Sequence, residues 1–411
     1  MARSLPAETE SQAIKLDHTS IRARFPGLDS DWTFFDNAGG AQVLGSVIER
    51  VAEYMRTSPV QLGAGYAASQ LGAARIRNAM QAMARFINAA DVSEIALGPS
   101  TTVMLRRLAE GLRPTLAPGD EIIVTDVDHE SNITPWLRLR EFGINIKTWQ
   151  LNADSWRLET DDLKALLNER TRLVCFTQTS NIVGSIEPVA ELARLVHAHG
   201  ARVCVDGVAY APHRAVDVRA WDVDFYVFSA YKVYGPHLGV LYGKRSALLE
   251  LANLNHEFTS RDALPAKLQP GAVPYELAYG LTAIPEYFDS LHAAHGGDVW
   301  PAITAHETSL GKRLLDFLGT KTKVRIIGPA QADSELRVPT ISFVIEGRDS
   351  AEIPAAMDSH YIGIRYGHFY VKRFIDRMGL SKQNGVVRIS AVHYNSMMEM
   401  DRLIDQLDEI L

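Results

Sequence analysis

The sequence predicts an α/β protein whose large domain is built on a parallel sheet and is followed by a smaller domain. Between about residues 90 and 250, short β-branched runs alternate with amphipathic stretches, as they do in βαβ units. The alternation restarts after about residue 290, which indicates a second unit. With 411 residues, 46% of them hydrophobic, the chain is long enough for both units to have buried cores.

The predicted elements follow one another in a regular order. Strands are predicted at 121–125, 145–151, 172–177, 202–206, 224–229 and 239–242, with helices at 134–142, 160–168 and 188–199 between them. Pro188 opens the last of these helices and Gly200 closes it, as helix starts and stops favour. In the second unit we expect a helix at 300–318, strands near 323–327 and 340–346, and a final helix at 396–411.

These elements divide the chain into three parts. We expect an N-terminal segment of residues 1–32 that packs on the small domain, a large ligand-binding domain of 33–290 and a small C-terminal domain of 291–411. Ligands of parallel sheets usually bind beyond the carboxyl ends of the strands. The polar residues that follow each predicted strand are therefore the candidates for chemistry.

Composition excludes several classes of function. The net charge is −7 and no dense Lys/Arg run occurs, so a nucleic-acid partner is not expected. The two cysteines, Cys175 and Cys204, lie inside apolar strand-like runs and are too few for a disulfide framework. The first twenty residues are mixed with charges, and no run of eighteen apolar residues occurs, so we expect a cytoplasmic protein that does not bind a membrane. No metal site is predicted.

A lysine and an aspartate follow two of the predicted strands. Lys232 lies in the sequence Phe-Ser-Ala-Tyr-Lys-Val-Tyr-Gly-Pro, where partial burial would lower its pKa and suit it to bond with an aldehyde. Alone, it could equally be a solvated loop lysine. Asp206 ends the apolar run Val-Cys-Val-Asp, where a carboxylate needs a cation such as a protonated pyridine ring. Its alternative is a helix cap.

Three further positions point to the same kind of ligand. The turn at 98–102 precedes a helix that reaches Leu112, and its hydroxyl and N–H groups form a candidate phosphate site or an ordinary N-cap. His129 follows another strand and could stack on an aromatic ring or lie at the surface. The amide of Asn181, after the next strand, could donate to a phenolate oxygen or simply belong to a turn.

In this order the motifs resemble the class V aminotransferase family of fold-type I pyridoxal-phosphate enzymes, and most of all its cysteine desulfurase and selenocysteine lyase group. The resemblance extends from Phe35 to the last helix. It implies a large domain with a mostly parallel seven-stranded sheet and a smaller α+β C-terminal domain. It also implies pyridoxal 5′-phosphate as the cofactor and an amino acid as the substrate.

The resemblance assigns a role to each candidate residue. Lys232 would bond to the cofactor aldehyde, Asp206 would pair with the pyridinium nitrogen, and His129 would stack on the ring, which makes these three the catalytic residues. Asn181 would donate near the phenolic oxygen. The phosphate would be held by a set of hydroxyl residues, namely Thr101, Thr102, Ser229 and Tyr231.

Some positions depart from the family pattern. Tyr231 stands where desulfurases often have a histidine, and Ala209 stands where related enzymes often have a Gln or His near the phenolic oxygen. The turn at 271–274 resembles the Gly-Thr-Pro segment that reaches the phosphate of the neighbouring subunit, but Ala272 replaces the threonine. We therefore expect a homodimer with shared active sites that lacks one side-chain contact.

The expected substrate residues lie near both ends of the chain. Arg388 resembles the arginine that binds the substrate α-carboxylate, and Asn37 lies in a segment similar to one that lines the substrate pocket. The segment 365–370 resembles the loop of the desulfurase nucleophile. There, Arg365 is a further expected substrate residue and Tyr370 stands at the position of the cysteine.

Because no cysteine lies in that loop, the sequence disfavours a persulfide-forming desulfurase. We expect a desulfurase-like lyase that acts at Cα and Cβ of an L-amino acid by C–S or other β- or γ-elimination. Amino-acid epimerisation and transamination are the open alternatives, and a non-catalytic cofactor-binding scaffold is another. A nucleotide-binding α/β protein ranks last, because no glycine-rich phosphate fingerprint follows a strand.

Overall fold

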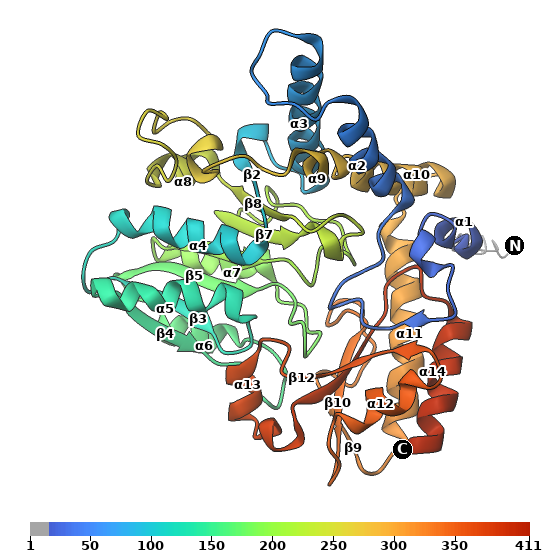
Figure 1. Ribbon diagram of the computed structural model, residues 1–411. Coiled ribbons are helices and arrows are strands. Elements are labelled where there is room, and N and C mark those ends of the chain that lie inside the picture. The colour runs from blue at the N-terminus through green and yellow to red at the C-terminus, as the bar shows by residue number, and fades with distance from the viewer. Residues whose placement is uncertain (1–15) are drawn as a thin grey trace, which may run out of the picture.

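A computed structural model describes residues 16–411 (Figure 1). Its centre is a seven-stranded sheet in the order β2-β8-β7-β6-β5-β3-β4. The strands are β2 (Ile95–Gly98), β3 (Glu121–Thr125), β4 (Asn145–Trp149), β5 (Thr171–Thr177), β6 (Arg202–Asp206), β7 (Phe225–Ser229) and β8 (Gly239–Gly243). Neighbouring strands from β4 to β7 are parallel, whereas β8 is antiparallel to both β7 and β2. The mostly parallel seven-stranded sheet is therefore confirmed, and all six predicted strands belong to it.

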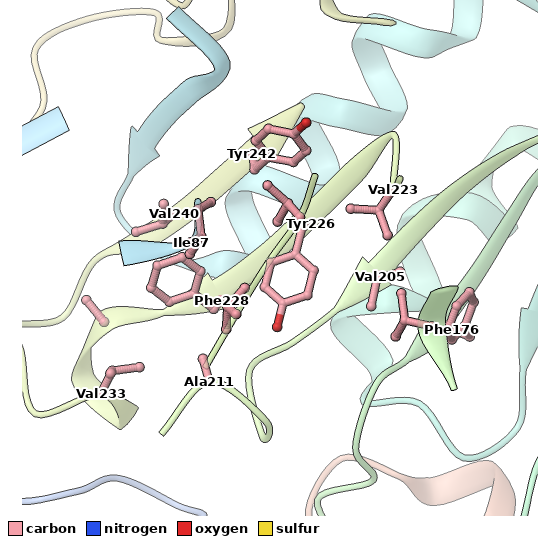
Figure 2. Close-up of a cluster of buried hydrophobic side chains, with 14 of the residues drawn as sticks. Ile87, Phe176, Val205, Ala211, Val223, Tyr226, Phe228, Val233, Val240 and Tyr242 are labelled. Carbon is pink, nitrogen blue, oxygen red and sulfur yellow. The ribbon is translucent and has the colours of Figure 1, made fainter. Parts of the chain in front are cut away.

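Both faces of this sheet are buried, as parallel strands require, except along the edge strand β4, where only Trp149 is fully buried. On one face, Figure 2 shows Phe176 of β5, Val205 of β6, Tyr226 and Phe228 of β7, and Val240 of β8 among the core residues. The covering helices include α4 (Thr101–Leu112), α5 (Thr134–Leu137), α6 (Thr160–Leu166) and α7 (Val189–Ala198). The helix predicted at 134–142 is α5 followed by the 3₁₀ segment Arg138–Phe142, so the prediction was right in place but not in helix type.

A helical layer beside β2 and β8 was not predicted. It consists of α2 (Gly45–Thr57), α3 (Ala67–Phe86), α8 (Arg245–Glu250), α9 (Tyr275–Gly280) and α10 (Ala283–His295), and α9 packs against both α2 and α3 (Figure 1). Part of the layer packs on the main core through Tyr54, Ile76, Met83 and Phe288. These helices enclose the antiparallel edge of the sheet.

The C-terminal part has its own core and sheet. Strands β9 (Val324–Ile327), β10 (Thr340–Ile345), β12 (Arg365–Gly367) and β13 (Val386–Ser390) form an antiparallel sheet in the order β12-β13-β10-β9. Its helices are α11 (Trp300–Gly319), α12 (Glu352–Asp358), α13 (Lys372–Arg377) and α14 (Met397–Ile410). The predicted helices at 300–318 and 396–411 correspond to α11 and α14, and the two predicted strands to β9 and β10.

The N-terminal segment contacts the C-terminal part. In α1 (His18–Arg22), Arg22 donates to the carbonyl of Tyr394 at 3.0 Å and pairs with Glu399 at 2.9 Å. Strand β1 (Thr33–Phe34) pairs with β11 (Ile362–Gly363), so the chain joins this part beyond the expected boundary at residue 33. Residues 1–15 of the expected segment lie outside the described residues, and we keep the three-part division as a proposal.

Among the helices between residues 16 and 411, none has both the length and the apolar character needed to cross a bilayer.

Candidate active site

The carboxyl ends of the parallel strands meet at one cavity. Thr177 of β5 and Asp206 of β6 are register partners, and Ser229 ends β7 beside them. The chain then turns through a short 3₁₀ segment that ends at Lys232. The cavity is lined by all eight residues that were expected to bind the cofactor: Thr101, Thr102, His129, Asn181, Asp206, Ser229, Tyr231 and Lys232.

A buried acid and a buried amine face this cavity. Burial raises the pKa of Asp206 from 3.8 to about 6, although the Val208 N–H donates to its Oδ1 at 2.9 Å. Among the described residues Asp206 has no ion-pair partner within 4.0 Å. Burial and then the charge of Arg388 lower the pKa of Lys232 to about 8, against the opposing charge of Asp206. The site therefore holds a carboxylate without a cation beside an amine that is partly neutral near pH 8.

His129 lines the cavity in one protonation state. Burial, with the charges of Lys232 and Arg388, lowers its pKa to about 4, so the ring is neutral at physiological pH. The Ser131 N–H donates to Nδ1 at 3.1 Å, which places the remaining proton on Nε2. The Tyr370 ring lies 4.9 Å from the His129 ring, centroid to centroid.

A second buried acid lies behind His129. Asp128 accepts from the Thr177 N–H at 2.9 Å and from the Asn132 amide at 2.7 Å. Burial, reinforced by the charge of Asp206, raises its pKa to about 8. At neutral pH Asp128 is therefore mostly protonated, and among the described residues that line the cavity Asp206 is the one carboxylate.

One end of the cavity is the N-terminus of α4. Ser100 caps the helix and accepts from the Val103 N–H, while the hydroxyls of Thr101 and Ser229 lie 2.7 Å apart. Gly239 lies directly beneath this turn, because a Cβ there would be 2.4 Å from the backbone nitrogen of Thr101. Hydroxyl groups and the positive end of a helix dipole thus face the same space, which suits a phosphate group.

The residues expected to bind the substrate differ in burial, and two of them are already paired with an acid of the chain. Arg388 is buried, and its Nη2 pairs with Asp36 at 2.7 Å while its Nη1 donates to the Asn181 carbonyl at 3.1 Å. Arg365 is more exposed and lies 3.4 Å from the other oxygen of Asp36. Tyr370 covers His129 as described above. Arg388 does not line the cavity, and its principal partner is an acid within the chain. Its contact with a substrate carboxylate stays a prediction.

Asn37 is not brought to the cavity. Its amide donates to the Ser390 carbonyl at 2.8 Å and to the Asn395 side chain at 3.1 Å, and its Oδ1 accepts from the Tyr394 hydroxyl. These partners lie more than 350 residues away in sequence, so a motif beside Asn37 could not indicate them. Asn37 does not line the cavity, and its side chain connects the segment after β1 to the strand end of β13. A substrate contact by Asn37 stays a prediction.

Sequence reasoning also missed polar residues of the cavity. Ser131, Thr177 and Thr179 line it, together with Ser100 of the predicted turn at 98–102, and the Thr179 hydroxyl is buried without a hydrogen-bond partner in the described structure. Their positions in the sequence could have indicated them, because each lies within four residues of a predicted site residue. Asp36 was also missed as the partner of Arg388, and no local pattern points to it.

The profile of the Aminotransferase class-V family matches residues 33–403. The chain belongs to this family. It is 43% identical over 401 residues to the aminotransferase-like protein FGM3 of Gibberella zeae, covering 95% of this chain and 98% of that protein. It is 36% identical over 416 residues to the cysteine desulfurase-like protein ustD of Aspergillus flavus, covering 98% and 93%. The crystal structure of the Escherichia coli cysteine desulfurase CsdA matches with a TM-score of 0.83 and 27% identity, covering 96% of this chain and 98% of that chain.

This class V protein is a pyridoxal-phosphate-dependent enzyme of the cysteine desulfurase-like kind, and the fold-type I architecture is confirmed. The residues present fit the cofactor. Asp206 is a buried carboxylate that lacks a cation, which a protonated pyridine nitrogen supplies. The Thr179 hydroxyl lacks a partner, and the start of α4 offers hydroxyl groups and a helix dipole to a phosphate.

The loop between β12 and α13 is attached to residues that follow β3 and β5. The Glu130 N–H donates to the Tyr370 carbonyl at 2.8 Å, and the Asn181 amide donates to the Phe369 carbonyl at 3.0 Å. Phe369 and Tyr370 have positive φ angles of 46° and 61°, which residues other than glycine rarely adopt. Two successive residues are thus held in a strained backbone that turns their rings toward Arg388 and His129.

Proposed function

We propose that this class V enzyme is a lyase that eliminates a β- or γ-leaving group from an L-amino acid without forming a persulfide on the protein. The observation that carries the proposal is the joint burial of Lys232 and Asp206 at one cavity that contains no thiol. The only cysteines of the chain, Cys175 and Cys204, are buried on β5 and β6 and face the second core of the sheet. A thiolate must reach the substrate sulfur to accept it.

We assign the cofactor-facing roles as follows. When bound, pyridoxal phosphate supplies an aldehyde that bonds to amines and a ring that withdraws electrons from Cα. Lys232 would hold the aldehyde until the substrate amine displaces it, and its freed Nζ would then accept the Cα proton, a task that suits an amine whose pKa is about 8. Asp206 would keep the ring nitrogen protonated. His129 would stack its neutral ring on the cofactor and exclude water from that face.

The remaining roles concern orientation. The hydroxyls of Thr101, Thr102, Ser229 and Tyr231 bind the phosphate, together with the first N–H groups of α4. Asn181 orients the phenolic oxygen through the second N–H of its amide, because the first donates to Phe369. Arg388 and Arg365 bind the substrate carboxylate. Tyr370, which lies over His129, bounds the space for the substrate side chain.

We also propose that two copies of the chain form a homodimer with shared active sites. The turn at 271–274, which resembles the segment that reaches a neighbouring subunit, is exposed around Gly271 and Ala272. Phe258 of the same connecting region is 88% exposed, so a large aromatic side chain is available there to a partner surface. Light scattering on the eluting protein should give twice the chain mass of 45.4 kDa. A monomer at all concentrations would refute this assembly.

The reaction is tested by combining spectroscopy with product analysis. The purified protein should be yellow, and the Lys232→Ala variant should lose the absorbance band of the lysine-bound cofactor. L-Amino acids with β- or γ-leaving groups should yield a keto acid and ammonia. Inversion at Cα would instead indicate an epimerase, and a requirement for a second keto acid would indicate an aminotransferase. Failure of every amino acid to exchange its α-proton in deuterated water would leave only the non-catalytic scaffold.

A further inference from the structure

We propose that Asp36 is a specificity-determining residue: its carboxylate occupies the Arg388 and Arg365 guanidinium groups until a substrate carboxylate replaces it, and its charge disfavours ligands with a second negative group. The inference rests on the proposed function in one respect, namely that these two arginines form the carboxylate subsite. Neither the family profile nor the relatives named above assign a role to this aspartate.

The contacts of Asp36 are those of an internal ligand. Its Oδ1 lies 2.7 Å from Arg388 Nη2 and its Oδ2 lies 3.4 Å from Arg365 Nη1, so one carboxylate bridges both arginines. The side chains are 25% exposed for Asp36, 2% for Arg388 and 55% for Arg365. The bridge therefore extends from a buried guanidinium group to one that solvent reaches.

Arg388 is left with one unsatisfied donor. Its Nη1 donates to the Asn181 carbonyl at 3.1 Å, but its buried Nε has no hydrogen-bond partner in the described structure. The Phe369 ring covers the face of the guanidinium group, 3.8 Å from Cζ, so new partners must approach in its plane. Asp36 uses a single oxygen on Nη2. A substrate carboxylate that accepts from Nε and Nη2 together would make the bidentate pair that Asp36 does not make, and this favours the exchange.

Gly39 makes the space that Asp36 occupies. A Cβ at Gly39 would be 2.7 Å from Oδ2 and 2.9 Å from Oδ1 of Asp36, which is closer than real side-chain contacts. The Gly39 N–H donates to the Asp36 carbonyl at 2.9 Å and closes the same turn. The neighbouring Gly40 is a natural control, because a Cβ there would meet only the Tyr231 ring, at an ordinary 3.6 Å.

A count of charges gives the selectivity. Two arginines and Asp36 carry a net charge of +1, since two cations face one anion. One substrate carboxylate brings the group to neutrality, whereas a second anionic group on the ligand leaves a negative charge beside Asp36. Without the Asp36 charge, a dicarboxylate would reach neutrality instead. Removing this charge should therefore shift preference toward ligands with two carboxylates.

The test is calorimetric titration of the full-length protein, as purified, with propionate and with succinate. Asp36→Asn should bind propionate about tenfold more tightly, the order expected when one charge-assisted competitor is lost. Its affinity for succinate should rise by a larger factor, so that the propionate-to-succinate ratio of Kd values increases. Gly39→Ala should tighten propionate binding as well, because it displaces the carboxylate, but should change the ratio less because the charge remains. Gly40→Ala and the exposed Asp31→Asn should leave both Kd values unchanged.

Equal or weaker propionate binding by both Asp36→Asn and Gly39→Ala would overturn the inference, as would an unchanged ratio in Asp36→Asn. If Asp36→Asn does not fold, the Gly39→Ala titration alone decides whether the carboxylate competes. The absorbance of the bound cofactor is recorded on the same samples. A colourless protein would count against the proposed function, whereas the titration of the arginines would still decide the role of Asp36.

Discussion

Replacing Asp206 by asparagine is expected to stabilise the cofactor-free protein while weakening its hold on the cofactor. In an unfolded chain the carboxyl group of an aspartate has a pKa of about 3.9. In the folded protein burial raises the pKa of Asp206 to about 6. The free energy of unfolding therefore falls as the pH rises between these two pKa values. Each unit of pKa difference corresponds to about 1.36 kcal/mol, so the loss at pH 7.5 is about 3 kcal/mol. Asparagine avoids this loss and keeps an acceptor for the Val208 N–H.

For a chain of 411 residues, this free energy corresponds to a rise in Tm of about 3 to 4 °C. Scanning calorimetry of both cofactor-free proteins at pH 7.5 should show that rise, and at pH 5 about half of the free-energy difference should remain. Added pyridoxal phosphate should raise the Tm of the wild type more than that of the variant, because Asp206 then pairs with a cation.

A buried aspartate with partners provides the control for this prediction. Asp224 accepts from the Val203 N–H at 2.9 Å and lies 2.8 Å from His197 Nε2. Asp224→Asn should therefore lower the Tm. An Asp206→Asn protein that is no more stable than the wild type at pH 7.5, or whose advantage is the same at pH 5, would refute the assignment of Asp206 as an uncompensated carboxylate.

Three other substitutions test separate parts of the structure. Gly239→Ala should weaken cofactor affinity about tenfold, because its Cβ would press on the first turn of α4, and equilibrium dialysis would measure this. The Tyr370→Cys variant should form no persulfide when it is incubated with L-cysteine, because its hydrogen-bonded loop holds the backbone at this position at a positive φ. Mass spectrometry would detect a persulfide on the introduced thiol, and its presence would contradict this prediction. Arg377→Ala should lower the free energy of unfolding by about 3 kcal/mol, because it leaves buried Asp126 without its cation, whereas Arg373→Ala, in an exposed pair, should cost under about 1 kcal/mol in urea unfolding.

The parts of the fold that were predicted are those with local signals. Apolar runs such as the one before Asp206 identify buried strands, and the polar residue that ends each run lies at the sheet edge by geometry alone. The residues expected around Lys232 therefore gathered at one cavity. Strand β2 was missed because its place beside β8 depends on a pairing about 145 residues away, as between Ile95 and Tyr242.

The contacts of the residues expected at the substrate could not be predicted from the sequence, because these contacts are long-range. Arg388 was recognised by its motif, but Asp36, its partner, lies 352 residues earlier, and neither neighbourhood indicates the pairing. The same holds for Asn37, whose amide is used by residues near the end of the chain. The residues expected to bind the cofactor follow strands of one sheet and share a local pattern, whereas those expected to bind the substrate come from both ends of the chain.

This assembly bears on the reaction. The loop that contains Tyr370 is fixed by its own carbonyl to the Glu130 N–H and by the neighbouring Phe369 carbonyl to Asn181, so its rings lie over His129 and Arg388. A loop that delivers a nucleophile to a leaving sulfur must place a reactive side chain at the substrate. This loop instead presents the aromatic rings of Phe369 and Tyr370. A leaving group would then depart as a free species. A lyase whose product leaves into solvent is the reaction that these contacts favour.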